Sequence, residues 1–177
     1  MKRLLPLLSL LFFANTALAH ETCDEEKIPE INEKPTYIYG DLVINETVSN
    51  PQAGENEWVE LVNRTNTVID MEGWYIQEGS GAKTTFGGSI GPGEFSIITN
   101  LKGNLNNGGD TIQLFDSHNT LISMLEYGEE IPAAQKGFSI ARVNEDFFLT
   151  TTITPGYENS ITKEENNQDE NKQQEEA

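Results

Sequence analysis

Glutamates are the side chains of this chain whose spacing comes closest to a catalytic arrangement. Glu57 and Glu60 lie three residues apart in a segment typical of a β-strand. Strand alternation sends their side chains to opposite faces, which is the wrong geometry for one active site. Glu60 could instead meet Glu46 from a neighbouring strand. A solvated strand face or a hydrogen bond to a loop amide explains these carboxylates as well, so we favour a structural role for them.

Residues that bind metals or act as nucleophiles are sparse. The histidines, His20 and His118, have no partner at the spacing of a zinc site. No calcium loop of the Asp-x-Asp-x-Asp-Gly type is present, and the Asn and Gly residues from 104 to 110 are better explained by backbone positions with positive φ. There is no Gly-x-Ser-x-Gly motif, and Cys23 has no histidine in motif context. We therefore expect no catalytic residue, no cofactor and no metal site, with weak calcium binding by acidic loops as the alternative.

Polar and aromatic residues on strands offer further candidate sites. Residues 45–47 and 63–65 fit the N-glycosylation pattern. In a bacterial protein we expect these asparagines to lie in strands and to make structural hydrogen bonds. An aromatic binding patch could form from Tyr37, Tyr39, Tyr75, Tyr127 and Phe148, although aromatic residues in strands more often pack in the core. The polar loops 49–56 and 77–83 are where such folds usually carry binding residues.

The N-terminus predicts export. Lys2 and Arg3 precede an apolar run of about ten residues, and Ala17-Leu18-Ala19 supplies the small residues of a cleavage site. The run is too short to span a membrane, so we expect residues 1–19 to be a signal peptide. The mature protein would be secreted, periplasmic or associated with the cell surface. Cys23 follows His20, Glu21 and Thr22 rather than small or apolar residues, which argues against a lipid anchor.

The charge of the chain is strongly acidic. It carries 29 Asp and Glu residues against 11 Lys and Arg residues, for a formal net charge of −18. Such a field repels phosphate backbones and anionic lipid surfaces. Between residues 36 and 161 the basic residues are scattered rather than clustered, so we expect neither nucleic-acid binding nor membrane insertion. They are Arg64, Lys83, Lys102, Lys136 and Arg142.

Composition divides the mature chain into three parts. Residues 20–35 are acidic with two prolines and no sustained period, and they predict a linker. Residues 36–161 hold nearly all the aromatic and β-branched residues and predict one domain. Residues 162–177 have a single apolar residue, which predicts a disordered acidic tail.

The central segment predicts a series of short strands separated by turn residues, with no helical period. This pattern is typical of an antiparallel β-sandwich or barrel. Val59 and Leu61 should face the core, as should Ile112 and Leu114, and a hairpin should turn across residues 116–119. The expected strands are 42–48, 58–62, 68–69, 74–76, 84–86, 95–99, 111–115, 120–127, 138–143 and 147–151.

The segment 56–77, NEWVELVNRTNTVIDMEGWYIQ, resembles the lamin tail domain family. Further blocks resemble the family in order, from Ile44-Asn45-Glu46 and Asn50-Pro51 to Thr154-Pro155-Gly156 and Asn159, so the resemblance covers about residues 41–159. It implies an all-β, immunoglobulin-like antiparallel β-sandwich, here with disordered acidic ends. The positions that match the family motifs are Glu46, Pro51, Glu57, Trp58, Glu60, Asn63, Gly73, Trp74, Asp110, Pro155 and Gly156.

The resemblance also implies a class of function. In nuclear lamins the module is a protein-interaction domain, and in secreted bacterial proteins it is similar to an accessory module found alone or beside nucleases and phosphoesterases. We expect a secreted, non-catalytic binding module that contacts protein or glycan at the cell envelope through loops or an exposed edge strand. The alternatives are an accessory module acting beside a secreted nuclease or phosphoesterase, and a structural subunit that self-associates by edge pairing or through Cys23.

Overall fold

The structure is a computed structural model that describes residues 35–161, and within these residues all regular secondary structure is β. The predicted signal peptide, residues 1–19, and the predicted acidic tail, residues 162–177, lie outside the described residues, as does the linker up to residue 34. No helix long and apolar enough to cross a membrane occurs in residues 35–161. The expected all-β, immunoglobulin-like antiparallel sandwich is what the structure shows.

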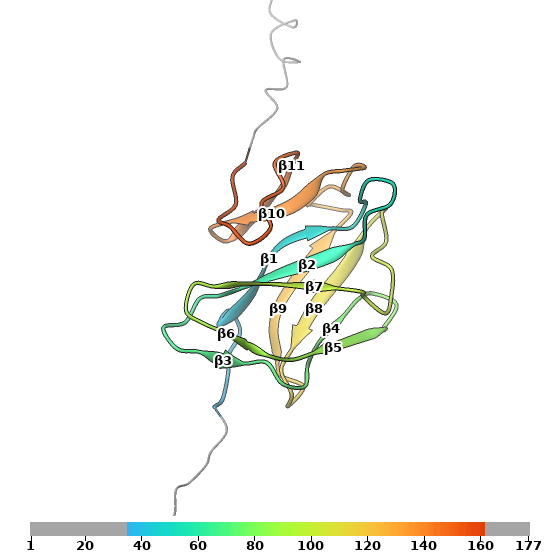
Figure 1. The fold of residues 1–177 in the computed structure, drawn as a ribbon. Helices are drawn as coiled ribbons and strands as arrows, with labels where there is room; N and C mark the ends of the chain where they lie inside the picture. Colours follow the sequence, from blue (N-terminus) through green and yellow to red (C-terminus); the bar gives the residue numbers. More distant parts are fainter. Residues whose placement is uncertain (1–34, 162–177) are drawn as a thin grey trace, which may run out of the picture. The chain divides into compact units, whose positions relative to one another are not determined.

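One layer of the sandwich is a five-stranded sheet with the order β11-β10-β1-β2-β7. Figure 1 shows β11 at its upper edge and β7 at the opposite edge. Every pair of neighbours is antiparallel. The strands are β1 (Leu42–Val48), β2 (Trp58–Asn63), β7 (Phe95–Thr99), β10 (Ser139–Val143) and β11 (Asp146–Thr150).

The second layer is a four-stranded antiparallel sheet with the order β5-β4-β8-β9. Its strands are β4 (Trp74–Gln77), β5 (Lys83–Phe86), β8 (Asp110–Phe115) and β9 (Leu121–Tyr127). A small pair, β3 (Ile69–Asp70) with β6 (Ser89–Ile90), joins the ends of the layers. The two layers also meet directly, because the Ile44 N–H on β1 donates to the Ser123 hydroxyl oxygen on β9 at 3.0 Å.

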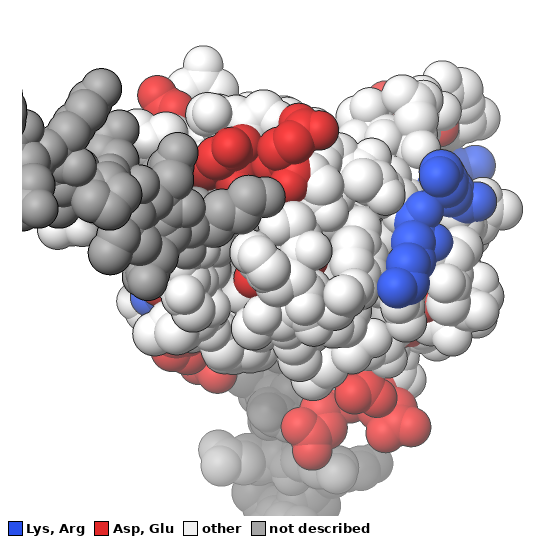
Figure 2. Space-filling view, turned by 90° about the horizontal axis from the view of Figure 1, so that it is seen from below, with Lys and Arg blue, Asp and Glu red and all other residues white. Residues whose placement is uncertain are grey.

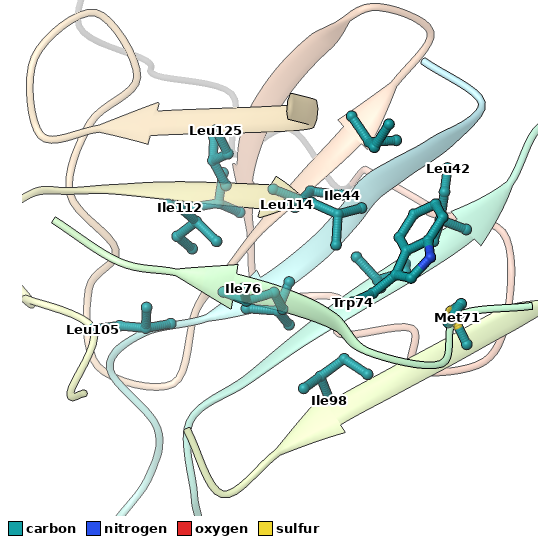
Figure 3. Packing of buried hydrophobic residues seen from close by; sticks show 14 of the residues in the cluster. Leu42, Ile44, Met71, Trp74, Ile76, Ile98, Leu105, Ile112, Leu114 and Leu125 are labelled. Atoms are coloured by element: carbon teal, nitrogen blue, oxygen red, sulfur yellow. The ribbon is translucent and has the colours of Figure 1, made fainter. Parts of the chain in front are cut away.

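The core lies between the two sheets and is built from alternate residues of each strand. Val59 and Leu61 of β2, and Ile112 and Leu114 of β8, are fully buried, as their alternation predicts. Figure 3 shows the ring of Trp74 beside Leu42 within the core cluster. The core residues come from both layers, so burial of their apolar surface holds the layers together.

The expected strand boundaries are close to those observed, with local exceptions. Val68 was expected in a strand, but β3 begins at Ile69 and the Val68 side chain is 63% exposed. The two-residue strand β6 was not predicted, because a single Ser-Ile pair has no readable alternation. The hairpin across residues 116–119 is present, with Asn119 at a φ of 65° and the Asp116 N–H donating to the Thr120 carbonyl.

The explanation given for the loop 104–110 is correct for one residue only. Gly109 has a φ of 144°, whereas the asparagines of this loop are not among the described residues with positive φ. Asn106 acts through its side chain instead, because its Oδ1 accepts the Gly108 N–H at 3.0 Å. This short-range side-chain turn is the other common reason for asparagine in a tight loop.

Candidate functional site

Glu46 and Glu60 come together in the five-stranded sheet. They are register partners on β1 and β2, and both side chains are completely buried. The register shifts between Ile44 and Glu46, so Asn45 is an extra residue in β1. Such a bulge reverses the alternation that follows it. Ile44 therefore faces the core, while Glu46 lies beside Glu60 on the outer face of the sheet.

The Glu46 carboxylate is held by donors from two distant parts of the chain. Its Oε1 accepts the Ser139 hydroxyl at 2.6 Å. Its Oε2 accepts both the N–H of Thr154 at 3.0 Å and the hydroxyl of Thr154 at 3.2 Å. Because the donors come from β10 and from the C-terminal segment, this carboxylate connects three stretches of chain.

The Glu60 carboxylate binds the same C-terminal segment. Its Oε1 accepts the amide of Asn45 at 2.8 Å, and its Oε2 accepts the N–H of Gly156 at 2.5 Å. Burial raises the pKa of this carboxyl above its ordinary value of 4.5, the hydrogen bonds from Gly156 and Asn45 oppose that rise, and the charge of Glu46 adds to it.

Asn159 completes the attachment of the C-terminal segment. Its amide nitrogen donates to the Arg142 carbonyl at 2.7 Å and to the Asn45 carbonyl at 3.0 Å, and its Oδ1 accepts the Thr154 hydroxyl at 3.0 Å. Residues 154–159 are therefore fastened across β10, β1 and β2 by polar contacts. We call this segment the strap.

The arrangement assigns Glu46 and Glu60 a structural role rather than a catalytic one. Each carboxylate is removed from solvent and occupied by donors of the fold itself. A general acid or base needs a free position within hydrogen-bond reach of a substrate. The hydrogen bond to a loop amide, considered from the sequence, is the explanation that the geometry supports. Ser139 is a partner that sequence reasoning missed, since nothing in its neighbourhood marks it.

The asparagines of both glycosylation patterns make the structural hydrogen bonds that were expected. Asn45 is bonded within the strap network. Asn63, also buried, donates to the carbonyls of Thr67 at 2.8 Å and Ile90 at 3.0 Å, and its Oδ1 accepts the Thr65 N–H at 2.9 Å. Asn63 therefore fixes the loop between β2 and β3.

Glu57 and Asp110 lie at one end of the sandwich and hold loops. Glu57 accepts the Leu105 N–H at 2.8 Å, and Asp110 accepts the N–H groups of Gly79 at 2.7 Å and Asn106 at 2.9 Å. Burial raises the pKa of Glu57, the Leu105 hydrogen bond lowers it, and the charge of Asp110 raises it further.

The neighbouring Glu78 is also occupied by its own loop. It accepts N–H groups of Ser80 and Ala82 and the Ser80 hydroxyl. Burial raises the pKa of Glu78, but these hydrogen bonds together outweigh burial and hold it below its ordinary value. Within residues 35–161 no group of three or more His, Cys, Asp or Glu side chains is arranged to hold a metal ion.

The remaining motif positions are spread over the fold. Trp74 is buried against Tyr37, with ring centroids 5.1 Å apart and an edge-on orientation, and Gly73 gives the turn before it a φ of 78°. Trp58 and Pro51 are half-buried, and Pro155 is exposed. Some motif positions make structural contacts at the strap site or in the loops around Asp110, and the others lie elsewhere in the fold, so the motif positions form no single reactive centre.

The aromatic residues do not form one exposed patch. Tyr127 is buried, and burial raises its pKa to about 12, with nearby carboxylates adding to the rise, while its hydroxyl donates to the Asn106 carbonyl at 2.9 Å. Tyr75 stacks on Phe115 with centroids 5.0 Å apart, and the Lys83 ammonium lies 4.2 Å from its ring centroid. Tyr37 packs on Trp74, whereas Tyr39 is 60% exposed. Of the five aromatic residues, Tyr127 belongs to the core cluster and Tyr37 packs against it, whereas Tyr39, Tyr75 and Phe148 do not, so packing in the core describes the set only in part.

A groove of about 630 Å³ lies beside the strap on the outer face of the five-stranded sheet. Val43 and Val62 contribute apolar surface, Arg64 and Asn144 contribute exposed polar groups, and Glu158 belongs to the strap. The Arg64 guanidinium lies 2.8 Å from the Glu145 carboxylate. We call this hollow the strap groove.

A second hollow of about 320 Å³, to which loop 49–56 contributes, is smaller. Sequence reasoning pointed to that loop and missed the strap groove, whose residues come from distant segments.

A comparison with protein-family models matches residues 35–129 to the lamin tail domain. The chain belongs to the lamin tail domain family. The match covers more than half of the sequence and includes the first nine strands, while the strap lies beyond it. No curated protein matches the chain. Lamin tail domains are immunoglobulin-like domains that generally act as interaction modules and are not themselves enzymes, which agrees with the structural role of Glu46 and Glu60.

Proposed function

We propose that this lamin tail domain protein is a secreted, non-catalytic binding module that contacts a protein or glycan at the cell envelope. The observation that carries the proposal is the strap groove, an open hollow on the outer face of the five-stranded sheet. Concave sites with apolar walls and a few polar groups are the usual form of ligand sites. The outer face is also where the buried carboxylates hold the strap, so the rim of the groove is fixed by the fold.

Charge distribution supports a ligand that is not a polyanion. Figure 2 shows acidic side chains in several separate groups on one face, with basic side chains gathered at one side. A phosphate backbone would need a continuous basic surface. A neutral glycan or a polypeptide fits the mixed apolar and amide lining of the strap groove better.

The first experiment is co-sedimentation of the protein with fractionated envelopes: wall polymer, outer surface and membrane vesicles, each with and without calcium. The test variant is Arg64→Glu at the groove rim. The matched control is Lys83→Glu on β5, which makes the same change of charge on the other sheet. Saturable pelleting that Arg64→Glu weakens and Lys83→Glu preserves supports the proposal.

Two results would contradict it. Pelleting that both variants reduce equally would point to overall charge rather than to the groove. Absence of pelleting with every fraction would favour the alternative, an accessory module for a separate secreted nuclease or phosphoesterase, which co-purification with such an enzyme would then test.

A further inference from the structure

β7 forms an open edge of the five-stranded sheet. It pairs with β2 from Phe95 to Thr99, and among the described strands no other lies beyond it. An unpaired edge presents a row of N–H and C=O groups that another extended chain can bind. The edge begins beside the strap groove, since Phe95 lines that groove.

The register shows which backbone groups point away from β2. The Asn63 N–H donates to the Glu94 carbonyl at 3.1 Å, immediately before β7 begins. In an antiparallel ladder, residues alternate between positions that bond to the partner strand and positions that do not. Ser96 and Ile98 therefore direct their backbone groups to β2, while Phe95, Ile97 and Thr99 direct theirs to the open edge.

β7 has none of the usual features that protect a sheet edge. The other edge strands of the two large sheets each contain a charged residue: Lys83 in β5, Glu126 in β9, and Asp146 in β11. The sequence of β7, Phe-Ser-Ile-Ile-Thr, contains no charge and no proline, and its pairing with β2 shows no register shift. Charges, prolines and bulges are the devices that keep edges from pairing.

The side chains beside this edge are apolar. Ile97 is 41% exposed and lies opposite Glu60, and Phe95, which is half-buried, lies opposite Val62. These residues share the outer face of the sheet, because residues directly opposite in a ladder point to the same side. An added strand would bury Ile97 with its own apolar side chains.

The surroundings of the edge are acidic at both ends. The exposed Glu94 precedes the strand, and Glu55 and Glu57 line the hollow at its far end together with Asn100. Two basic residues lie near the edge: Lys102 follows it in sequence, and Arg64 lines the strap groove with Phe95 but is paired with the Glu145 carboxylate at 2.8 Å. A second copy of this chain would bring the same carboxylates and repel, whereas a cationic segment would be attracted.

We propose that β7 is a docking edge that takes an extended, cationic peptide segment of a partner protein as a sixth strand of the sheet. Main-chain hydrogen bonds to Phe95, Ile97 and Thr99 would supply affinity, and alternate apolar side chains would pack beside Ile97. The inference rests on the proposed binding function and narrows its ligand to a protein with an exposed basic segment.

The test uses the full chain and a fluorescent nine-residue peptide of alternating Lys and Val. A peptide with Glu in place of Lys, and one with a central proline, are the control ligands. Ile97→Pro removes an N–H that faces the open edge and leaves the bonds to β2 in place, a position where edge strands tolerate proline. If the proline variant fails to fold, Ile97→Lys tests the same inference, because it places a positive charge on the edge that would repel a cationic peptide. The control is Met124→Lys on β9, where the side chain has a similar exposure of 37%.

The expected result is saturable binding of the Lys-Val peptide, weakened at least about tenfold by either Ile97 variant because main-chain bonds carry the affinity. Met124→Lys should preserve it, and amide exchange should slow at residues 95–99. Binding that the Ile97 variants leave unchanged, no binding of the Lys-Val peptide, or equal binding of the Glu-Val peptide would overturn the inference. Concentration-dependent dimerisation that Ile97→Lys abolishes would overturn it in favour of a second copy. None of these results would contradict the proposed binding function itself, which is tested separately by the effect of Arg64→Glu on envelope binding.

Discussion

Glu46 and Glu60 lie opposite each other on β1 and β2, and each accepts a backbone N–H from the same strap, Glu46 from Thr154 and Glu60 from Gly156. Two buried carboxylates side by side would ordinarily destabilise each other. Here the carboxylate oxygens of both residues accept hydrogen bonds from the strap, and also from Asn45 and Ser139. The pair converts two acidic side chains into an attachment site for a segment about a hundred positions further along the chain.

Glu60→Gln should destabilise the fold. The Glu60 carboxylate accepts from both Asn45 and Gly156, and glutamine can offer only one oxygen, so one buried donor loses its partner. The expected loss in free energy of unfolding is about 1–3 kcal/mol, measured by urea denaturation. Glu129→Gln, at an exposed position, is the matched control and should change stability little. Equal effects of the two substitutions would show that the strap contacts contribute nothing.

The contribution of Glu60 to stability should fall as the pH rises. Because its folded-state pKa lies above the ordinary value of 4.5, the folded protein binds this proton more tightly than the unfolded chain does. Stability from this group is therefore fully present below pH 4.5 and is reduced as pH rises through the folded pKa. The difference in unfolding free energy between the native protein and Glu60→Gln should shrink from pH 4.5 to pH 7. A difference that grows over this range would place the pKa below its ordinary value.

Asn159→Ala should loosen the strap. The substitution removes donors to the carbonyls of Arg142 and Asn45 and an acceptor for the Thr154 hydroxyl. Each lost bond contributes about 1 kcal/mol, so we expect faster amide exchange at Thr154, Gly156 and Tyr157 and a lower urea midpoint. Ser160→Ala, at the exposed neighbouring position, should have neither effect. Unchanged exchange in Asn159→Ala would mean that other contacts hold the strap.

The sequence predicts the strands of this fold better than it predicts the strap site. Val59 and Leu61 alternate with polar neighbours, so their burial is local information. The face on which Glu46 lies cannot be predicted from its neighbours in the sequence. The bulge at Asn45 reverses the alternation of β1, and this bulge is visible only in the register with β2. The contacts of Thr154 and Ser139 with Glu46 join residues about a hundred positions apart, and no periodic pattern in the sequence predicts them. The strap groove could not be predicted from the sequence for the same reason, since five distant segments line it.

The two tryptophans should differ sharply in their contribution to stability. Trp74 is 1% exposed in the core and packs on Tyr37, whereas Trp58 is half-buried on the outer face. Trp74→Ala should cost about 3–5 kcal/mol, the usual cost of emptying a large core site, and Trp58→Ala should cost less. Urea denaturation monitored by circular dichroism measures both. A larger cost for Trp58→Ala would contradict the packing described for the two rings.

Gly128→Ala should be destabilising mainly through a collision of backbones. A Cβ at Gly128 would lie 2.4 Å from the Cα of Gly109 and 2.7 Å from the Gly108 carbonyl oxygen, and the residue also has a φ of 105°. Gly54→Ala is the matched control, because Gly54 has a similar φ of 93° but nothing within 4 Å of the added Cβ. The control measures the strain of positive φ alone, about 1–2 kcal/mol, and the excess for Gly128→Ala measures the contact between the two loops. Equal losses in thermal unfolding would show that these loops move apart at no cost.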